Sequence, residues 1–195
     1  RLRPITYTTN KHLIPLGNKP MIFNAIEKIA EVGVREIYIN VNPGEQELQR
    51  YIGDGSKFGV RVTYIEQSGG PKGLAHIVKN AETFLRGEPF LFYLGDNIIL
   101  GSLRRFVEQF QNEQLDCMLA FAHVKDPQRF GTPVFENGKL IRVEEKPAVP
   151  QTDLAQAGIY IYGDAIFSAV NAIEPSVRGE YEISDANSYL IAKGY

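Results

Sequence analysis

The stretch from Arg35 to Gln67 reads REIYINVNPGEQELQRYIGDGSKFGVRVTYIEQ, and its pattern indicates the architecture of the chain. Residues 35–42 and 60–67 are rich in β-branched and aromatic side chains, as strands are. The segment between them, residues 44–55, predicts a short helix that ends in glycines. Two strands separated by a helix predict parallel strands joined by a helical crossover.

The same alternation continues on both sides of this stretch. Residues 20–32 place three isoleucines on one helical face, and apolar residues recur at helical spacing between Leu74 and Leu85. PFLFYLGDN, residues 89–97, is a nearly continuous apolar run, which is typical of a strand that is buried on both faces. The first half of the chain therefore predicts a Rossmann-like α/β fold with a mostly parallel central sheet flanked by helices.

The second half adds a hairpin and further strands. Asn137-Gly138 stands between two alternating runs and is a strong signal for a type I′ hairpin. The other predicted elements are a helix around Leu103 to Phe110, strands at 116–124 and 155–163, and helices at 165–172 and 183–192. The chain contains no repeat and no linker, so we expect a single domain over residues 1–195.

The composition limits the classes of function. The chain has 195 residues, of which 44% are hydrophobic and 23% charged, and its formal net charge is −2. This balance disfavours a broad basic surface for nucleic acid. The single cysteine, Cys117, excludes an intramolecular disulfide framework. No apolar stretch reaches the length of a membrane span, and no secretory signal opens the chain. We therefore expect a cytoplasmic globular protein that binds neither nucleic acid nor membrane.

The first segment is basic, since Arg1, Arg3, Lys11 and Lys19 all precede the first acid, Glu27. Such a local excess indicates either a site for an anion or a solvated basic end. An α/β fold of this kind usually opens with a strand that leads into a phosphate-facing loop. No strand-like run precedes Arg1, so we expect the first strand and its turn to lie before this residue.

Asp96 is the candidate metal ligand. Ligands of open parallel sheets lie outside the carboxyl ends of the strands, and Asp96 follows the predicted strand PFLFYL. A carboxylate at this position suits Mg²⁺, which takes few protein ligands and fills its other sites with water and phosphate oxygens. The alternative is a turn aspartate with Asn97 beside it.

Lys11 and Lys146 are candidate phosphate-binding residues. Lys146 lies in EEKP, where Glu144 and Glu145 point to opposite faces of a predicted strand, so only one of them can share a site with a given ligand. A carboxylate can accept hydrogen bonds from sugar hydroxyls. The alternative is a solvated strand end.

A glycine-containing loop is the candidate base-binding segment. SGGPKG, residues 68–73, follows Gln67. Glycines allow the backbone to approach a planar base closely, and the glutamine amide offers both a donor and an acceptor to a base edge. An ordinary connection between a strand and a helix would have a similar sequence.

Taken in order, several segments resemble the sugar-1-phosphate nucleotidylyltransferases, and among them the glucose-1-phosphate thymidylyltransferases. These segments are RLRPIT (1–6), NKHLIPLGNKPMI (10–22), LGDN (94–97), RFG (129–131), EEKP (144–147), AGIY (157–160) and GEYEISD (179–185). The resemblance covers the whole chain, and its ordered set of motifs is specific where a single motif is not. It implies the nucleotide-diphospho-sugar transferase fold, a Rossmann-like α/β domain with an inserted β-hairpin.

The resemblance implies a role for each matched residue. Arg1 and Lys11 would reach the nucleotide's phosphates, and Asp96 would bind Mg²⁺ at the α-phosphate. The residues implied at the base are Gln67, Gly73 and Leu74. Lys146 would hold the sugar phosphate. The residues implied in the sugar pocket are Asn97, Gly131, Glu145 and Gly158, with Tyr160 supporting that end of the site.

The reaction implied by the resemblance is in-line attack by an oxygen of glucose-1-phosphate on the α-phosphorus of dTTP. The products are dTDP-glucose and pyrophosphate. The nucleophile is already an anion, so no general base is required. Catalysis would consist of positioning and of charge neutralisation by Arg1, Lys11, Lys146 and Mg²⁺.

Three departures from the family pattern keep alternatives open. The glycine-rich G-G-x-G-T stretch and the second metal-binding aspartate are not in the chain, and we expect both in a longer protein, with a C-terminal β-helix as in the family's long form. The base loop is one residue longer than usual, and Phe130 stands where many relatives have tyrosine. The alternatives are the same reaction with UTP or an aminosugar-1-phosphate, and a non-catalytic nucleotide-sugar-binding subunit. The family contains dimers and tetramers, so a homo-oligomer is one expectation.

Overall fold

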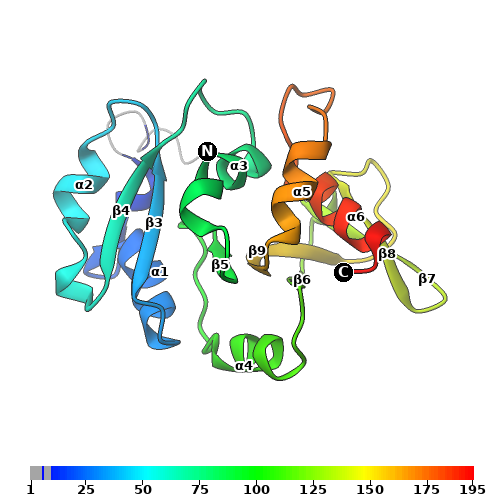
Figure 1. The fold of residues 1–195 in the computed structure, drawn as a ribbon, viewed down its shortest axis with the longest axis horizontal. Coiled ribbons are helices and arrows are strands. Elements are labelled where there is room, and N and C mark those ends of the chain that lie inside the picture. Colours follow the sequence, from blue (N-terminus) through cyan, green and yellow to red (C-terminus); the bar gives the residue numbers. More distant parts are fainter. Residues whose placement is uncertain (1–5, 7–9) are drawn as a thin grey trace. The chain divides into compact units, whose positions relative to one another are not determined.

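A computed structural model of the chain describes residue 6 and residues 10–195. The described chain divides into two compact units (Figure 1). Unit 1 contains the described residues up to Ser68 together with Tyr93–Gln109. Unit 2 contains Gly69–Phe92 together with Phe110–Tyr195. Helix α4 (Arg104–Asn112) runs across the last boundary between them.

Unit 1 is built on the β-α-β segment that the sequence predicts. Strands β3 (Glu36–Val41) and β4 (Arg61–Glu66) pair in parallel, with Glu36 opposite Arg61. Between them lie α2 (Glu47–Ile52) and the short 3₁₀ helix η3 (Ser56–Phe58), so the predicted parallel crossover is confirmed.

Helix α1 (Met21–Glu31) and the 3₁₀ helix that precedes it pack against this pair of strands. Helix α1 buries Ile22 and Ile26, as the isoleucine spacing predicts. The elements that precede it are the 3₁₀ helix η2 (Lys11–Leu13) and the two-residue strands β1 (Pro15–Leu16) and β2 (Lys19–Pro20). Apolar side chains of η2, α1, β3, α2 and β4 form one buried cluster.

Unit 2 holds a sheet in the order β5–β9–β6. Its strands are β5 (Phe90–Tyr93), β6 (Cys117–His123) and β9 (Leu154–Tyr162), and β6 runs antiparallel to β9. The structure ends β5 earlier than the apolar run at 89–97 suggests. Leu94 to Asn97 form a turn, in which Asn97 N donates to Leu94 O at 2.9 Å. The strand ends early because Gly, Asp and Asn favour turns over strands.

The predicted hairpin is confirmed and lies in unit 2. Strands β7 (Gly131–Glu136) and β8 (Lys139–Glu145) pair antiparallel. Asn137 and Gly138 have φ values of 50° and 76°, as both central residues of a type I′ turn must be left-handed.

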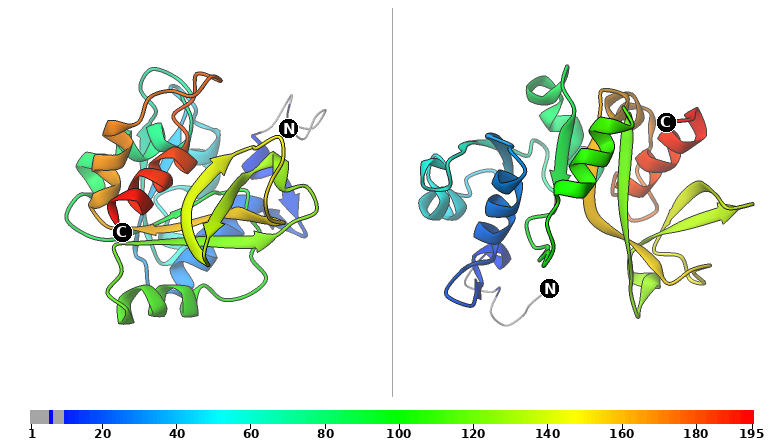
Figure 2. Two further views of the ribbon diagram at one scale, coloured as in Figure 1. Left: turned by 90° about the vertical axis from the view of Figure 1, so that its right-hand side faces the viewer. Right: turned by 90° about the horizontal axis from the view of Figure 1, so that it is seen from below.

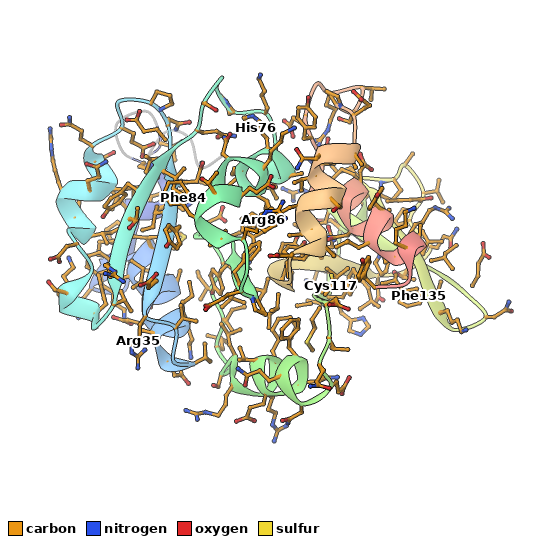
Figure 3. All side chains as sticks on the ribbon, viewed as in Figure 1. Arg35, His76, Phe84, Arg86, Cys117 and Phe135 are labelled. Atoms are coloured by element: carbon orange, nitrogen blue, oxygen red, sulfur yellow. The ribbon has the colours of Figure 1, made fainter. Side chains whose placement is uncertain are left out.

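Three helices complete unit 2: α3 (Leu74–Leu85), α5 (Ala165–Ala172) and α6 (Ile183–Lys193). Figure 2 shows α5 and α6 side by side, in orange and red, and α6 also contacts β8. Cys117 lies on β6, and burial raises the pKa of its thiol to about 12 (Figure 3). Arg86, which follows α3, places its guanidinium 5.2 Å from the ring centre of Phe167 on α5. None of the described helices is both long and apolar enough to cross a membrane.

The core of unit 2 is aromatic, and a hydrogen bond between two fully buried side chains crosses it. Tyr160 and Tyr162 stack with their ring centres 5.6 Å apart. The hydroxyl of Tyr162 donates to Asn187 Oδ1 on α6 at 2.7 Å, and neither residue is exposed. This hydrogen bond ties the sheet to α6, the helix that also reaches β8.

Replacing Tyr162 with Phe should therefore destabilise the chain by about 1–3 kcal/mol, because Asn187 Oδ1 would remain buried without a donor. The measurement is the free energy of unfolding in urea. Exchanging both partners, Tyr162→Phe with Asn187→Leu, should recover part of the loss because it removes the stranded acceptor. A single substitution that leaves the unfolding free energy unchanged would contradict this account of the core.

Candidate functional site

In unit 1, Lys11 and Asp96 meet although 85 residues separate them. Lys11 Nζ donates to Asp96 Oδ2 at 2.6 Å, and both side chains remain partly exposed. Lys11 lies in η2, which Asn10 caps by accepting from His12 N at 3.0 Å. Asp96 lies on the turn that follows β5. The two residues that the sequence assigns to phosphate and to metal are thus brought into contact.

The electrostatics of this pair keep Asp96 ionised. Burial by itself raises the pKa of Asp96, but the hydrogen bond and the charge of Lys11, joined by the charge of His12, hold that pKa below its usual range. Burial, followed by the charge of Lys11, lowers the pKa of His12. Asp96 therefore presents a carboxylate at neutral pH, with Oδ2 on Lys11.

A carboxylate oxygen is a ligand that suits Mg²⁺. No group of three or more His, Cys, Asp or Glu side chains that could hold a metal occurs within residue 6 and residues 10–195. The donor set at Asp96 therefore fits an ion that takes one protein carboxylate and completes its coordination with phosphate oxygens and water.

The other predicted residues of unit 1 lie at strand ends. Gln67 directly follows β4 and is buried, with its backbone N donating to Val41 O at 2.9 Å. Its Oε1 accepts from Asn40 Nδ2 on β3 at 3.4 Å. The carbonyl of Asn97 accepts from the hydroxyl of Tyr93 at 3.2 Å. Arg1 lies outside the described residues.

In unit 2, Gly73 and Leu74 lie where the loop meets α3. Gly73 has a φ of 97°, and a Cβ at this position would come within 2.5 Å of Tyr181 O, so only glycine fits. Tyr181 N donates to Lys72 O at 2.7 Å, and Ala75 N donates to Tyr181 O at 3.1 Å. Leu74, the first residue of α3, packs against the aromatic core.

The aromatic side chain of Tyr181 also contacts this end of α3. Its ring stacks on His76, which Figure 3 labels, with the ring centres 6.0 Å apart. The segment before α6 is thus held against the start of α3 by two backbone hydrogen bonds and one ring contact.

Glu145 is the centre of a charged cluster at the end of β8. Its Oε1 lies 3.2 Å from Lys146 Nζ and 3.3 Å from Arg178 Nη2. Its Oε2 accepts from Ser184 Oγ on α6 at 2.7 Å. Glu144 faces the other way and pairs with Arg142 at 2.6 Å, which confirms that the two glutamates lie on opposite faces.

Lys146 has a left-handed backbone, with a φ of 46°. A non-glycine residue in this region is uncommon and costs backbone energy, and such residues cluster at functional sites. Lys146 N donates to Phe130 O at 2.9 Å, which fixes the chain as it leaves the hairpin. This turn carries the Lys146 ammonium to the Glu145 carboxylate.

The remaining predicted sugar-pocket residues of unit 2 lie on two strands, β7 and β9. Gly131 lies at the start of β7 opposite Glu145, and a Cβ there would overlap Ser184 Oγ and Gln156 Oε1. Tyr160 is buried, and burial, followed by the charge of Glu145, raises its pKa. Gly158, on the same strand, has a φ of 69° and lies where the pairing with β6 is irregular.

Sequence reasoning missed Arg178 and the residues that hold it. Arg178 is the only basic residue between Lys146 and Lys193, and the same stretch contains six acidic residues, Asp153, Asp164, Glu174, Glu180, Glu182 and Asp185. A lone cation in an acidic stretch is a signal that could have found it. Ser184 lies within GEYEISD, but the sequence indicates no contact between Ser184 and Glu145.

Comparisons with known proteins give one consistent family. The family described as "Nucleotidyl transferase" matches residues 1–195. A glucose-1-phosphate thymidylyltransferase of Streptomyces antibioticus is 44% identical over 196 residues, which cover 100% of this chain and 55% of that protein. A protein of the same name from Neisseria meningitidis is 35% identical, with 100% of this chain and 68% of the relative covered. The chain thus spans little more than half of the Streptomyces relative.

Solved structures agree with these relatives. A Bacillus anthracis protein described as a glucose-1-phosphate thymidylyltransferase is 36% identical, has a TM-score of 0.90, and is matched over 99% of this chain and 78% of its own. A UDP-glucose pyrophosphorylase solved with UDP-glucose is 25% identical, with a TM-score of 0.84 over 99% of this chain and 82% of its own. The fold is therefore the nucleotide-diphospho-sugar transferase fold that the resemblance implies, and the chain belongs to the nucleotidyl transferase family.

Proposed function

We propose that the protein carrying this chain transfers a thymidylyl group from dTTP to glucose-1-phosphate, forming dTDP-glucose and pyrophosphate. The observation that carries the proposal is the cluster at Glu145, where two cations share one carboxylate oxygen. A sugar phosphate carries both kinds of group that this cluster suits: an anion for Lys146 and Arg178, and hydroxyls for Glu145.

The sugar-phosphate roles fall to unit 2. Lys146 and Arg178 bind the phosphate of glucose-1-phosphate, and Glu145 accepts hydrogen bonds from the sugar's hydroxyls. Gly131 and Gly158 are assigned to the sugar pocket, and Tyr160 supports that end of the site. Asn97, in unit 1, is assigned to the sugar as well.

The nucleotide roles fall to other residues. Lys11 binds the triphosphate and Arg1 joins it there, so that both neutralise charge on the leaving pyrophosphate. Asp96 would hold Mg²⁺, which when bound would polarise the α-phosphate and neutralise developing charge. The residues assigned to the base are Gln67, Gly73 and Leu74.

The chemistry follows from charge and position. An oxygen of the glucose-1-phosphate monoester attacks the α-phosphorus in line, the bond from this phosphorus to the bridging oxygen breaks, and pyrophosphate carries the electron pair away. The attacking oxygen is already an anion, so the protein needs no general base. Its contribution is to hold two mutually repelling anions together, and three or more cationic side chains lower that repulsion.

The direct test is pyrophosphate release by the full-length protein with Mg²⁺ and glucose-1-phosphate. The triphosphates dTTP, UTP, ATP, CTP and GTP are compared side by side. We expect the largest kcat/KM with dTTP. Release with UTP alone would replace the thymidylyl assignment by a uridylyl one. Release only with an aminosugar-1-phosphate would change the sugar, and nucleotide-sugar binding without any turnover would favour the non-catalytic subunit.

Lys146→Ala should raise the KM for glucose-1-phosphate by about tenfold or more, because a charge-assisted hydrogen bond contributes about 1.5–3 kcal/mol. The KM for dTTP should change by less than about threefold, because Lys146 is assigned to the sugar phosphate and not to the nucleotide. Steady-state kinetics with each substrate varied in turn gives both values.

Lys139→Ala is the matched control, since Lys139 is exposed at the opposite end of the same strand β8. It should leave both constants unchanged. If Lys146→Ala raised the two KM values equally, the assignment of Lys146 to the sugar phosphate would be wrong.

A further inference from the structure

Arg178 is held by a buried carboxylate that the reaction itself does not call for. Glu182 is 5% exposed. Arg178 Nη2 donates to both of its oxygens at 2.8 Å, and Arg178 Nε lies 3.2 Å from Oε1. Charge-assisted contacts from two nitrogens of one guanidinium fix the plane of that group as well as its place.

A serine completes the environment of this carboxylate. Ser176 Oγ donates to Glu182 Oε1 at 2.7 Å and accepts from Arg178 N at 3.2 Å. The turn itself is closed by Gly179 N donating to Ser176 O at 2.8 Å and by Ser176 N donating to Glu180 O at 2.9 Å. The backbone and the side chain of Arg178 are therefore both fixed relative to Glu182.

The position of Glu182 connects this turn to the rest of unit 2. Glu182 directly precedes α6, and Ala186 N in the first turn of the helix donates to its carbonyl at 3.3 Å. Ser188, one helical turn after Ser184, both donates to Val143 O and accepts from Val143 N at 2.9 Å. The docking of α6 on β8 thus sets the place of Glu182 relative to Glu145.

The charges alternate along this row of side chains. The order is Glu182, Arg178, Glu145 and Lys146, and each neighbouring pair is in contact. The strongest contact of Arg178 is with Glu182, and its contact with Glu145 is the longer one, at 3.3 Å. An arriving phosphate can therefore meet the guanidinium while Glu182 keeps hold of it.

We propose that Glu182 is a positioning residue for sugar-phosphate binding, which holds the Arg178 guanidinium in place for the phosphate. This inference rests on the proposed function. Glu182 takes the Nε and Nη2 edge of the guanidinium, so the Nη1 edge remains to meet a phosphate oxygen. A flexible arginine side chain loses conformational entropy when it binds a phosphate, which weakens binding. Arg178, held by Glu182, has already lost this entropy on folding.

Glu180 supplies a matched comparison. Its Oε2 lies 3.4 Å from the same Arg178 Nη2, but the residue is exposed. Exposed ion pairs contribute little, because water screens them and the side chains must be ordered. The positioning therefore falls to Glu182 and not to Glu180, although both carry the same charge near the same atom.

The experiment measures the binding of dTDP-glucose by titration calorimetry and the KM values of both substrates for the full-length protein. The variants are Glu182→Gln, Glu180→Gln, Arg178→Gln and the double variant Arg178→Gln with Glu182→Gln. We expect Glu182→Gln to weaken dTDP-glucose binding and to raise the KM for glucose-1-phosphate, each by about tenfold. In Glu182→Gln, the KM for dTTP should stay within about twofold of the wild-type value. In Glu180→Gln, the affinity for dTDP-glucose and the KM for glucose-1-phosphate should both stay within about twofold of the wild-type values.

The double variant separates positioning from general stability. If Glu182 acts through Arg178, adding Glu182→Gln to Arg178→Gln should change the glucose-1-phosphate KM by no more than about twofold. Equal effects of Glu182→Gln in both backgrounds, or a rise in both substrate KM values together, would overturn the proposal. Should Glu182→Gln not fold, Glu182→Asp keeps the charge but shortens the reach, and it should weaken glucose-1-phosphate binding in the same direction.

The same titration distinguishes a failure of the proposed function from a failure of the role of Glu182 alone. A wild-type protein that binds no dTDP-glucose would overturn the proposed function, and the role of Glu182 with it. A wild-type protein that binds dTDP-glucose, with Glu182→Gln binding equally well, would overturn the role of Glu182 alone.

Discussion

The carboxylate of Glu145 holds two cations at one of its oxygens and a serine hydroxyl at the other. Lys146 and Arg178 carry like charges, and without a shared counterion they would repel each other. The carboxylate therefore keeps the two cations close together before any anion arrives. In the proposed function, a phosphate that meets the cations frees Glu145 to accept hydrogen bonds from the hydroxyls of the sugar.

The place of this carboxylate depends on how α6 lies against β8. Ser184 and Ser188 are one helical turn apart and therefore share a face of the helix. They meet Glu145 and Val143, which are two residues apart and share a face of the strand. Because the spacing of the two serines on the helix matches that of Glu145 and Val143 on the strand, both contacts form together. Ser184 holds the Glu145 carboxylate, and Ser188 holds the strand backbone beside it. The buried pair of Tyr162 and Asn187 ties the same helix to the central sheet.

The sequence predicted the parts of the fold that depend on local pattern. Asn137-Gly138 specified its hairpin because two successive residues with positive φ require this chemistry. The spacing of apolar residues predicted α1 and the parallel strands β3 and β4. The run at 89–97 extends past the end of β5 at Tyr93, because Leu94 already enters the turn that Gly95, Asp96 and Asn97 favour.

The site was predictable only as separate residues. Lys11 and Asp96 were both expected to face phosphate or metal, but their contact spans 85 residues and no periodicity indicates it. Lys146 was identified by its motif, but the motif did not predict its left-handed backbone. Arg178 and Glu182 lie in an irregular turn, where no repeat of apolar residues marks which side chains face inward. Such contacts come from tertiary packing, which a single sequence records only indirectly.

The most direct measurement is a crystal structure of the full-length protein with dTDP-glucose bound. The account predicts that phosphate oxygens of the ligand lie within hydrogen-bond distance of Lys146 Nζ and the Arg178 guanidinium. It also predicts that Glu145 accepts from a hydroxyl of the glucose ring, while Glu182 still holds Arg178. A ligand whose glucose and phosphates lie away from these residues, with Lys146 and Arg178 still on Glu145, would contradict the assignment of the sugar-phosphate site.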